Sequence, residues 1–542
     1  MRPGHLRAAT ERMTDAYDAI VVGSGFGGAV TACRLSEAGY RVLILERGRR
    51  WGPDTFPRAP DDPWLFDSEH PERNNGWMDV RFFRHMGVAQ GAGVGGGSLV
   101  YANVSVEPQV AMFEEGWPPE ISYQELAADF RTVGRMLNVQ EVPIAQWPAR
   151  TSLMSEAASQ IGAHDRFRPL DLAVNFDPAW RPDLPDAYTP ARSHEHVNAE
   201  GMAQGTCVHL GQCDIGCPVK ARNTLDFNYL ARAERHGAEI RPLHVVRSIG
   251  WDADGYRVRC DRIVDGTLVA VTERARVVIV AAGSLGSTEL LLRSRDTVKT
   301  LPGLPATLGR GWSSNGDFLT LGYHPSRSVM PTVGPTITSA IDFRDGSQDG
   351  ESFLIEDGGF PDVVAIWLER SRRRLPLPWP RRLLTRLLSE IGRGSEGLID
   401  HTMPWFAQGR DAGDGCLRLG RKWWIVGPRV LKLDWDVTAS LPLMTAIGNM
   451  HARLATATGG TPFVPPTWAL LRYLITPHPL GGCNMGTSPA NSVVDHRGEV
   501  WNQRNLFVAD GSIVPEAIGA NPSRTIAALA ARIARLIIED AR

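Results

Sequence analysis

Short apolar runs alternate with a helical pattern at the start of the chain. Residues 17–22 (Tyr-Asp-Ala-Ile-Val-Val) predict a buried strand, and apolar side chains recur at helical spacing over residues 29–38. Gly39 ends that pattern, and residues 41–45 (Arg-Val-Leu-Ile-Leu) predict a second buried strand. The succession predicts a βαβ unit, whose two strands lie parallel in one sheet.

The turn between the first strand and the helix is rich in glycine and reads Gly-Ser-Gly-Phe-Gly-Gly over residues 23–28. Gly23 permits the tight turn, Gly25 lets the backbone approach a pyrophosphate, and Gly28 lets the helix pack closely on the strand. Glu46, at the tip of the second strand, can accept hydrogen bonds from ribose hydroxyls. These features predict a dinucleotide site. A glycine-rich turn in another α/β fold is the alternative, and it leaves Glu46 unexplained.

Three later segments can return to the same sheet and nucleotide. Residues 90–100 contain five glycines and cannot readily form the interior of a helix or strand. Residues 277–287 predict a buried strand that runs into a turn of small residues, with a helical pattern over 288–295. Residues 505–511 predict a last strand, and an alanine-rich helix follows over 523–540. The βαβ unit alone does not decide between FAD and NAD, but these returning segments favour FAD.

In this order, the segments resemble the glucose-methanol-choline (GMC) flavoenzymes, and among them the non-covalent sterol oxidases. The likeness is strongest in His-Pro-Leu-Gly-Gly-Cys at 478–483, in 505–515, in Gly-Ala-Asn-Pro at 519–522, and in the glycine loop. The resemblance implies an α/β fold with a Rossmann-like FAD-binding domain and an inserted α+β substrate domain, which contains an antiparallel sheet. The FAD domain would be assembled from discontinuous segments, residues 14–50, 87–108, 205–310 and 477–542. The substrate domain would comprise residues 51–86, 109–204 and 311–476.

The same resemblance implies that a hydride passes from the carbinol carbon of an alcohol to FAD. His478 matches the family histidine that binds the substrate hydroxyl and helps to remove its proton, although a Pro-His-Pro histidine can also be a simple turn residue. Asn521 matches the second active-site position, and before Pro522 it can also cap a helix. Glu356 falls roughly where sterol oxidases place a carboxylate that shifts the steroid double bond. A solvated loop carboxylate is the alternative for Glu356.

The resemblance also implies the residues that contact the cofactor. They lie in the glycine turns and at strand tips: Gly23, Gly25, Phe26, Gly27, Gly28, Glu46, Arg47, Gly93, Gly96, Gly97, Ser98, Val100, Tyr101, Asn103, Val246, Ala282, Gly283, Asp510, Gly511, Asn521 and Pro522. Tyr101-Ala102-Asn103 departs from the family, which more usually has an asparagine-glycine pair there, so Tyr101 adds bulk near the flavin. His85 is the candidate for covalent attachment of FAD, but non-covalent binding is favoured.

Composition narrows the partners of the protein. The 542 residues carry a formal net charge of −2, which disfavours nucleic acid because binding it normally takes a strongly basic face. The resemblance implies a bulky hydrophobic secondary alcohol of sterol type, with oxygen as the acceptor and hydrogen peroxide as a product. A dehydrogenase that uses a quinone or protein acceptor would share all these motifs. A flavin-dependent isomerase or lyase would bind FAD without oxidising alcohols.

Targeting and metal signals are weak. The first 17 residues contain no apolar run long enough for a signal peptide, and no stretch of 18 apolar residues follows, so a cytoplasmic protein is predicted. Seven cysteines in a long chain predict reduced thiols without disulfides. Cys207, Cys213 and Cys217, with His209, suggest zinc, but their spacing differs from paired zinc knuckles, so no metal is predicted.

A basic amphipathic pattern over residues 381–391 follows the arginine-rich stretch 370–374. Such a helix can rest weakly on an anionic membrane surface, or it can pack its leucines inward as an ordinary surface helix. Inward packing is favoured.

Overall fold

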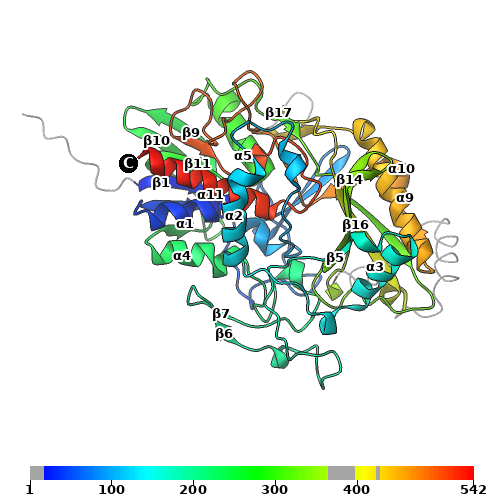
Figure 1. The fold of residues 1–542 in the computed structure, drawn as a ribbon. Coiled ribbons are helices and arrows are strands. Elements are labelled where there is room, and N and C mark those ends of the chain that lie inside the picture. Colours follow the sequence, from blue (N-terminus) through cyan, green and yellow to red (C-terminus); the bar gives the residue numbers. More distant parts are fainter. Residues whose placement is uncertain (1–16, 364–396, 423–427, 542) are drawn as a thin grey trace, which may run out of the picture.

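The computed structural model describes residues 17–363, 397–422 and 428–541. One side of the molecule holds a mainly parallel sheet with helices α1, α4 and α11, and the other side holds an antiparallel sheet with α3 and α9 (Figure 1). The chain passes several times between the two sides. The α/β class, the Rossmann-like domain and the antiparallel sheet predicted from the sequence are confirmed.

The larger sheet combines both ends of the chain. Its strands follow the order β8 (Glu239–Arg241), β2 (Val42–Leu45), β1 (Tyr17–Val22), β11 (Thr267–Val280), β10 (Gly255–Val264) and β9 (His244–Asp252), with β21 (Leu506–Val508) also paired to β11. The pairs β8–β2, β2–β1, β1–β11 and β11–β21 are parallel. Residues 19–22 and 42–45 are buried throughout, as expected for parallel strands covered on both faces.

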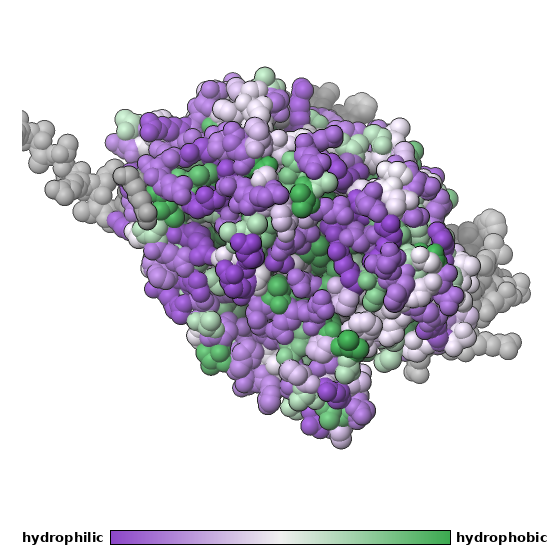
Figure 2. Space-filling model, viewed as in Figure 1, coloured by the Kyte–Doolittle hydropathy of each residue, from purple (hydrophilic) through white to green (hydrophobic). Residues whose placement is uncertain are grey.

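Helices pack beside this sheet. Helix α1 (Phe26–Glu37) packs against α11 (Ser523–Asp540) and α4 (Tyr229–Arg235), and α11 packs against α2 (Tyr123–Met136). Helix α5 (Gly283–Leu292) follows β11. Helix α2 belongs to segment 109–204, proposed for the substrate domain, yet it packs against α11. The face in Figure 2 is mostly hydrophilic, with hydrophobic residues scattered in small groups.

The second large sheet is antiparallel at every pairing. Its order is β19 (Thr461–Phe463), β13 (Phe318–Tyr323), β16 (Thr402–Gly409), β15 (Glu351–Asp357), β14 (Ser339–Gln348) and β5 (Phe167–Pro169). Helices α9 (Leu441–Ala457) and α3 (Ala149–Gln160) pack against it, with α10 (Pro466–Leu471) nearby (Figure 1). A sheet backed by helices on one side leaves its other face for a ligand.

Smaller sheets link these layers. One contains β20 (Leu474–Thr476), β4 (Met86–Gly91) and β3 (Met78–Phe82), and it joins segments proposed for different domains. The others are β12 (Arg310–Trp312), β17 (Gly415–Arg421) and β18 (Arg429–Asp434), and the projecting hairpin β6 (His196–Val197) and β7 (Ala203–Gln204). A short helix, α8, spans Gly397–Asp400.

Several element boundaries differ from the prediction. Helix α1 begins at Phe26, three residues early, because the glycine turn feeds directly into the first helical turn. Helix α5 begins at Gly283 and ends in a wider π-helical turn, Arg293–Thr297, instead of spanning 288–295. The terminal helix spans 523–540 as predicted.

The structure also bears on the predictions about membrane contact, cysteines and metal binding. The amphipathic segment 381–391 lies outside the described residues. Within the described ranges, no helix is long and apolar enough to cross a membrane. All seven cysteines are free thiols. No group of three histidine, cysteine or acidic residues in the described part of the chain could hold a metal ion.

Candidate active site

Backbone contacts require the glycines of the first turn. Gly23 has a φ of +99°, which disfavours other residues. A Cβ on Gly27 would lie 1.6 Å from the carbonyl oxygen of Ala509, and one on Gly28 would lie 2.0 Å from that of Gly23. A Cβ on Gly25, in contrast, would approach nothing closer than 3.9 Å. The turn is therefore closely packed against the sheet but open at Gly25, where the sequence predicts a pyrophosphate.

The start of α1 has unused donors. Its first residues have no side-chain cap and no acidic residue in the first turn, so its terminal N–H groups can bind an anion. Glu46 is buried and faces the same turn: it accepts hydrogen bonds from the Ser24 backbone N–H at 3.1 Å, the Ser24 hydroxyl at 2.7 Å and the Gly48 N–H at 2.9 Å. The carboxylate that was predicted to bind ribose thus also holds the glycine turn in place.

The glycine loop is organised by Arg222, a residue that the sequence analysis missed. The buried guanidinium donates to Asn103 Oδ1 at 2.7 Å and to the carbonyls of Ser98, Leu99 and Tyr101 at 2.7, 3.2 and 3.0 Å. Four acceptors on a single turn fix its shape. Nothing in the local sequence of Arg222 indicates this role, since its partners lie more than 100 residues earlier.

The Tyr101 side chain is tied down beside this loop. Its hydroxyl donates to the carbonyl of Asn223 at 3.1 Å, and its ring meets Phe26 edge-on with centroids 5.5 Å apart. Burial raises the Tyr101 pKa, so the phenol stays neutral. The Tyr101 side chain is thus held in place between the start of α1 and the segment around Asn223.

The other predicted cofactor residues lie around the carboxyl ends of the strands. Asp510 accepts hydrogen bonds from the Gly283 N–H at 2.8 Å and the Ser287 hydroxyl at 2.5 Å, which ties β21 to the start of α5. Arg47 points to Asp79, 2.7 Å away. Val246 lies near the start of β9, whose first residue, His244, donates its N–H to the carbonyl of Glu46.

His478 is held by a buried carboxylate. Its Nδ1 lies 2.9 and 3.1 Å from the two oxygens of Asp317, whose side chain is completely buried. Burial lowers the pKa of His478, but the Asp317 charge and hydrogen bond, together with the charge of Glu356, outweigh it, so the pKa is raised overall. The structure therefore leaves Nε2 as the ring nitrogen for a substrate.

Glu356 and Asn521 lie at the same place. Glu356 is completely buried in β15, not in a solvated loop, and its Oε2 accepts a hydrogen bond from the Gln408 amide at 2.9 Å. Burial raises its pKa to about 7, although Gln408, His478 and Asn521 all favour the charged form. Glu356 Oε1 and Asn521 Oδ1 have no hydrogen-bond partner among the described residues. The structure thus brings together His478, Glu356 and Asn521, and adds Asp317 and Gln408.

Sheet register explains this meeting. Glu356 pairs with Phe406 of β16 on one side and with Ala340 of β14 on the other, and Ala340 pairs with Arg168 of β5. Side chains of directly paired residues share a face, so all four point to one side of the sheet. The Phe406 ring lies 6.1 Å from that of His478, which places the row against the histidine.

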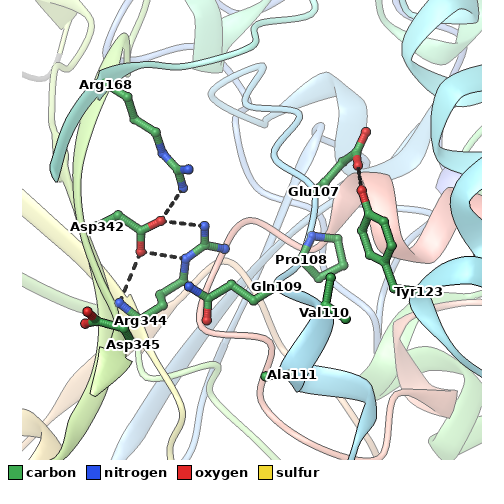
Figure 3. A pocket seen from close by; sticks show the side chains of 10 residues that line it. All are labelled: Glu107, Pro108, Gln109, Val110, Ala111, Tyr123, Arg168, Asp342, Arg344 and Asp345. Carbon is green, nitrogen blue, oxygen red and sulfur yellow. Dashed lines mark hydrogen bonds and ion pairs between the residues drawn. The ribbon is translucent and has the colours of Figure 1, made fainter. Parts of the chain in front are cut away.

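An open surface cleft of about 620 Å³ lies at the far end of this row (Figure 3). Arg168 and Arg344 both bind Asp342 on its sheet side, at 2.6 and 2.8 Å. Glu107, in the loop after the glycine segment, and Tyr123, at the start of α2, line the opposite side. Its charged lining differs from the apolar wall that a bulky hydrophobic alcohol requires.

The cysteine-rich segment does not form a ligand cluster. His209 stacks on Trp180 with centroids 4.2 Å apart, and its Nε2 lies 3.3 Å from Gln146 Oε1. Burial, with the nearby Arg150 charge, lowers the His209 pKa to about 3. Burial likewise raises the pKa of the Cys207 and Cys213 thiols, so both stay protonated.

Comparison with known proteins accounts for the arrangement. A model of an NAD(P)-binding Rossmann-like domain matches residues 21–70, and models of GMC oxidoreductases match residues 195–296 and 450–530. A cholesterol oxidase of Acinetobacter baumannii is 30% identical, with 95% of this chain and 93% of that protein aligned. The chain belongs to the GMC oxidoreductase family.

Other GMC relatives agree. A cholesterol oxidase of Mycobacterium tuberculosis is also 30% identical, over 96% of this chain and 91% of that protein. A long-chain-alcohol oxidase of Arabidopsis thaliana is 26% identical, over 98% of this chain and 69% of that protein. The crystal structure of pyridoxine 4-oxidase from Mesorbium loti matches with a TM-score of 0.60 and 17% identity, covering 96% and 98% of the two chains, which supports the fold. This GMC oxidoreductase is therefore FAD-dependent and acts on alcohols.

The residues present fit FAD. The open Gly25 turn and the uncapped start of α1 suit its pyrophosphate. Asn103 Nδ2, Gln90 Nε2 and Asn521 Oδ1 are buried polar atoms without a partner in the described part of the protein, and they lie in or beside the glycine loop and at the start of α11. Buried polar atoms normally have partners, and the polar edge of a flavin ring supplies both donors and acceptors.

Proposed function

We propose that this GMC oxidoreductase oxidises a bulky hydrophobic secondary alcohol of sterol type to its ketone and uses oxygen as the acceptor, giving hydrogen peroxide. The observation that carries the proposal is the buried Glu356 carboxyl beside His478 and Asn521. Alcohol oxidation alone needs one base for the hydroxyl proton, and His478 would be that base. The Glu356 carboxyl is a second group that can exchange a proton, because burial raises its pKa to about 7, and its presence supports a further proton-transfer step. Two relatives named cholesterol oxidase support the substrate class.

FAD, when bound, would supply the two-electron acceptor for the carbinol hydride and the donor to oxygen. His478 Nε2 accepts the hydroxyl proton of the alcohol, and the Asn521 amide fixes the alcohol or the flavin edge. In a substrate with a β,γ double bond, the Glu356 carboxylate removes a proton from the carbon between the new carbonyl and the double bond. It then returns that proton to the far end, giving the conjugated ketone. The residues at the glycine turns and strand tips that the sequence predicts as cofactor contacts would hold FAD without a covalent bond.

The test is an anaerobic spectrum of the purified holoenzyme, before and after addition of short alcohols, long-chain alcohols and hydroxysteroids, with air admitted afterwards. Bleaching of the flavin band by a hydroxysteroid, with rapid recovery and peroxide in air, is the expected result. Slow recovery in air, with fast recovery on adding a quinone, would assign a dehydrogenase instead. Failure of every alcohol to bleach the band would refute the proposed function.

The Glu356 step has its own test. The Glu356→Gln variant keeps the size of the side chain and its contact with Gln408 but removes the acid. With a β,γ-unsaturated hydroxysteroid, it should reduce the flavin and release the unconjugated ketone. Formation of the conjugated ketone at the wild-type rate would contradict the role of Glu356.

A further inference from the structure

The five residues 313–317 (Ser-Ser-Asn-Gly-Asp) precede strand β13 and contact both sides of the reactive centre. We propose that they form the positioning segment of the active site: Asp317 fixes the tautomer of His478, and Asn315 fixes the turn that delivers Asn521. The inference rests on the proposed roles of His478 and Asn521, and it adds the residues that hold them in place.

Burial raises the pKa of Asp317, although His478 and Thr476 favour its ionised form. When ionised, Asp317 can act on His478 in one way only. A carboxylate accepts hydrogen bonds and cannot donate them, so the Nδ1 atom at 2.9 Å must carry the proton. The neutral imidazole then has its lone pair on Nε2, as a base for the alcohol proton requires. Thr476 holds the carboxylate and the histidine together: its hydroxyl donates to Asp317 Oδ2 at 2.5 Å and accepts from the His478 N–H at 2.9 Å.

Asn315 clamps the other catalytic residue. Its Oδ1 accepts hydrogen bonds from the N–H groups of Ile518 and Gly519, at 2.9 and 3.0 Å, and its Nδ2 donates to the carbonyl of Ala520 at 2.9 Å. These three backbone groups immediately precede Asn521. Asn315 has a φ of +56°, a left-handed conformation that asparagine tolerates better than most residues.

The segment is itself held rigidly. Asp411 accepts hydrogen bonds from the Ser313 hydroxyl at 2.5 Å and from the Ser314 N–H and hydroxyl at 2.8 and 2.7 Å. The Ser313 backbone also pairs with Leu480, two residues after His478. One short segment is thus hydrogen-bonded both to His478 and to the turn that precedes Asn521, and it sets the spacing between them.

The first test compares the pH dependence of kcat/KM in the wild-type holoenzyme and in Asp317→Asn. Among the described residues, the titratable groups acting on His478 are Asp317 and Glu356, and Phe406, whose ring also faces it, is uncharged. His478 must be neutral to accept a proton, so activity rises with pH through its pKa. Removal of the Asp317 charge lowers that pKa, and the acid limb should move down by about one pH unit or more. It should do so in a Glu356→Gln background as well.

The maximal rate should also fall, by about 100-fold, because the asparagine amide can donate to Nδ1 and select the wrong tautomer. Asp411→Asn is the matched control, since it also removes a buried carboxylate from the segment, but one with no contact to His478. It should lower the melting temperature without moving the acid limb. An unmoved limb and an unchanged rate in Asp317→Asn, at equal FAD content, would overturn the role of Asp317.

Asn315→Gly tests the second half, because glycine keeps the left-handed backbone while the clamp is lost. Flavin reduction by the alcohol should slow by about 10-fold or more, with no movement of the acid limb. Asn502→Gly is the control: Asn502 also has a positive φ, +63°, but is exposed. Equal reduction rates in the wild-type protein, Asn315→Gly and Asn502→Gly would overturn the clamp.

A readout without substrate separates this inference from the proposed function. In holoenzyme labelled with ¹⁵N-histidine, the His478 signals are those lost in His478→Gln, and their shifts report the tautomer and its titration. Wild-type His478 should be protonated at Nδ1, and Asp317→Asn should change this. If no alcohol reduces the flavin but the signals behave as stated, the proposed function fails and the positioning role stands. Identical signals in the two proteins would overturn the positioning role whatever the substrate.

Discussion

The folded wild-type protein, with its buried Glu356, should lose stability relative to the Glu356→Gln variant as the pH rises into the alkaline range. Burial raises the pKa of this carboxyl from 4.5 to about 7, whereas in the unfolded chain it titrates near its ordinary value. Between these two values the folded state holds a proton that the unfolded state has lost. Stability therefore falls as the pH rises from 4.5 to 7, and the loss is complete above that range.

The size of the effect follows from the shift. A difference of about 2.5 pKa units corresponds to about 3 kcal/mol, and the complete burial of Glu356 means that solvent does not screen it. Glu356→Gln should thus gain up to about 3 kcal/mol over the wild-type protein at pH 8, relative to their difference near pH 4.5. With an unfolding entropy of about 2 cal/mol/K per residue, this is about 3 °C in melting temperature for the whole chain, and more if the domains unfold separately.

Thermal unfolding of both holoenzymes, followed by circular dichroism from pH 4.5 to 8, measures this gain. The difference between the two melting temperatures should widen with pH, and titrations that the proteins share cancel in that difference. Glu351→Gln is the control on the same strand, because Glu351 is partly exposed. A Glu356→Gln variant whose melting temperature relative to the wild type stays constant or falls between pH 4.5 and 8 would refute the reasoning.

Three further outcomes are expected. Gly27→Ala places a methyl 1.6 Å from the Ala509 carbonyl oxygen and should abolish the folded holoenzyme. The methyl of Gly97→Ala meets no protein atom within 4 Å, so this variant should keep the wild-type melting temperature but bind FAD less tightly. Flavin spectra and thermal unfolding curves check both variants. Arg222→Met removes four hydrogen bonds to the glycine loop, and each contributes about 1 kcal/mol net. The purified variant should therefore contain less FAD than the wild-type protein, and full FAD occupancy would contradict the role of Arg222. His478→Gln should slow flavin reduction by about 10²- to 10⁴-fold in stopped-flow experiments while FAD stays bound, and a wild-type rate would exclude it as the base.

The sequence predicted the nucleotide side of the fold well, for a physical reason. Strands β1, β2 and the end of β11 are buried on both faces, so they appear as continuous apolar runs. Gly23, Gly27 and Gly28, which lie between β1 and β2, are required by backbone contacts that leave no room for a Cβ. The apolar runs and the glycine pattern are each contiguous in the sequence, so they can be recognised without knowledge of the distant residues that they contact.

The reactive centre was predicted only in part because its contacts are long-range. His478 and Asn521 lie in recognisable motifs, but Asp317 is 161 residues from His478, and nothing around it distinguishes it from an ordinary loop aspartate. Glu356 was open to interpretation as a solvated carboxylate because acidic and glycine residues follow it. Its burial depends on Gln408, which lies 52 residues away on the neighbouring strand.

The small sheet of β3, β4 and β20 has a consequence for how such an enzyme diversifies. Strand β4 runs into the glycine loop, strand β20 runs into His478, and the two are paired from Leu474 with Met86 to Thr476 with Val88. The histidine and the glycine loop are thereby held in register by backbone hydrogen bonds, whatever the lining of the pocket above them. We expect the parts of the insertion between β13 and β20 that lie away from Glu356 and Gln408 to accept changes of length and shape that alter which alcohols enter, while the reacting groups keep their spacing. Substrate specificity can then change among related enzymes while the spacing of the reacting groups stays the same.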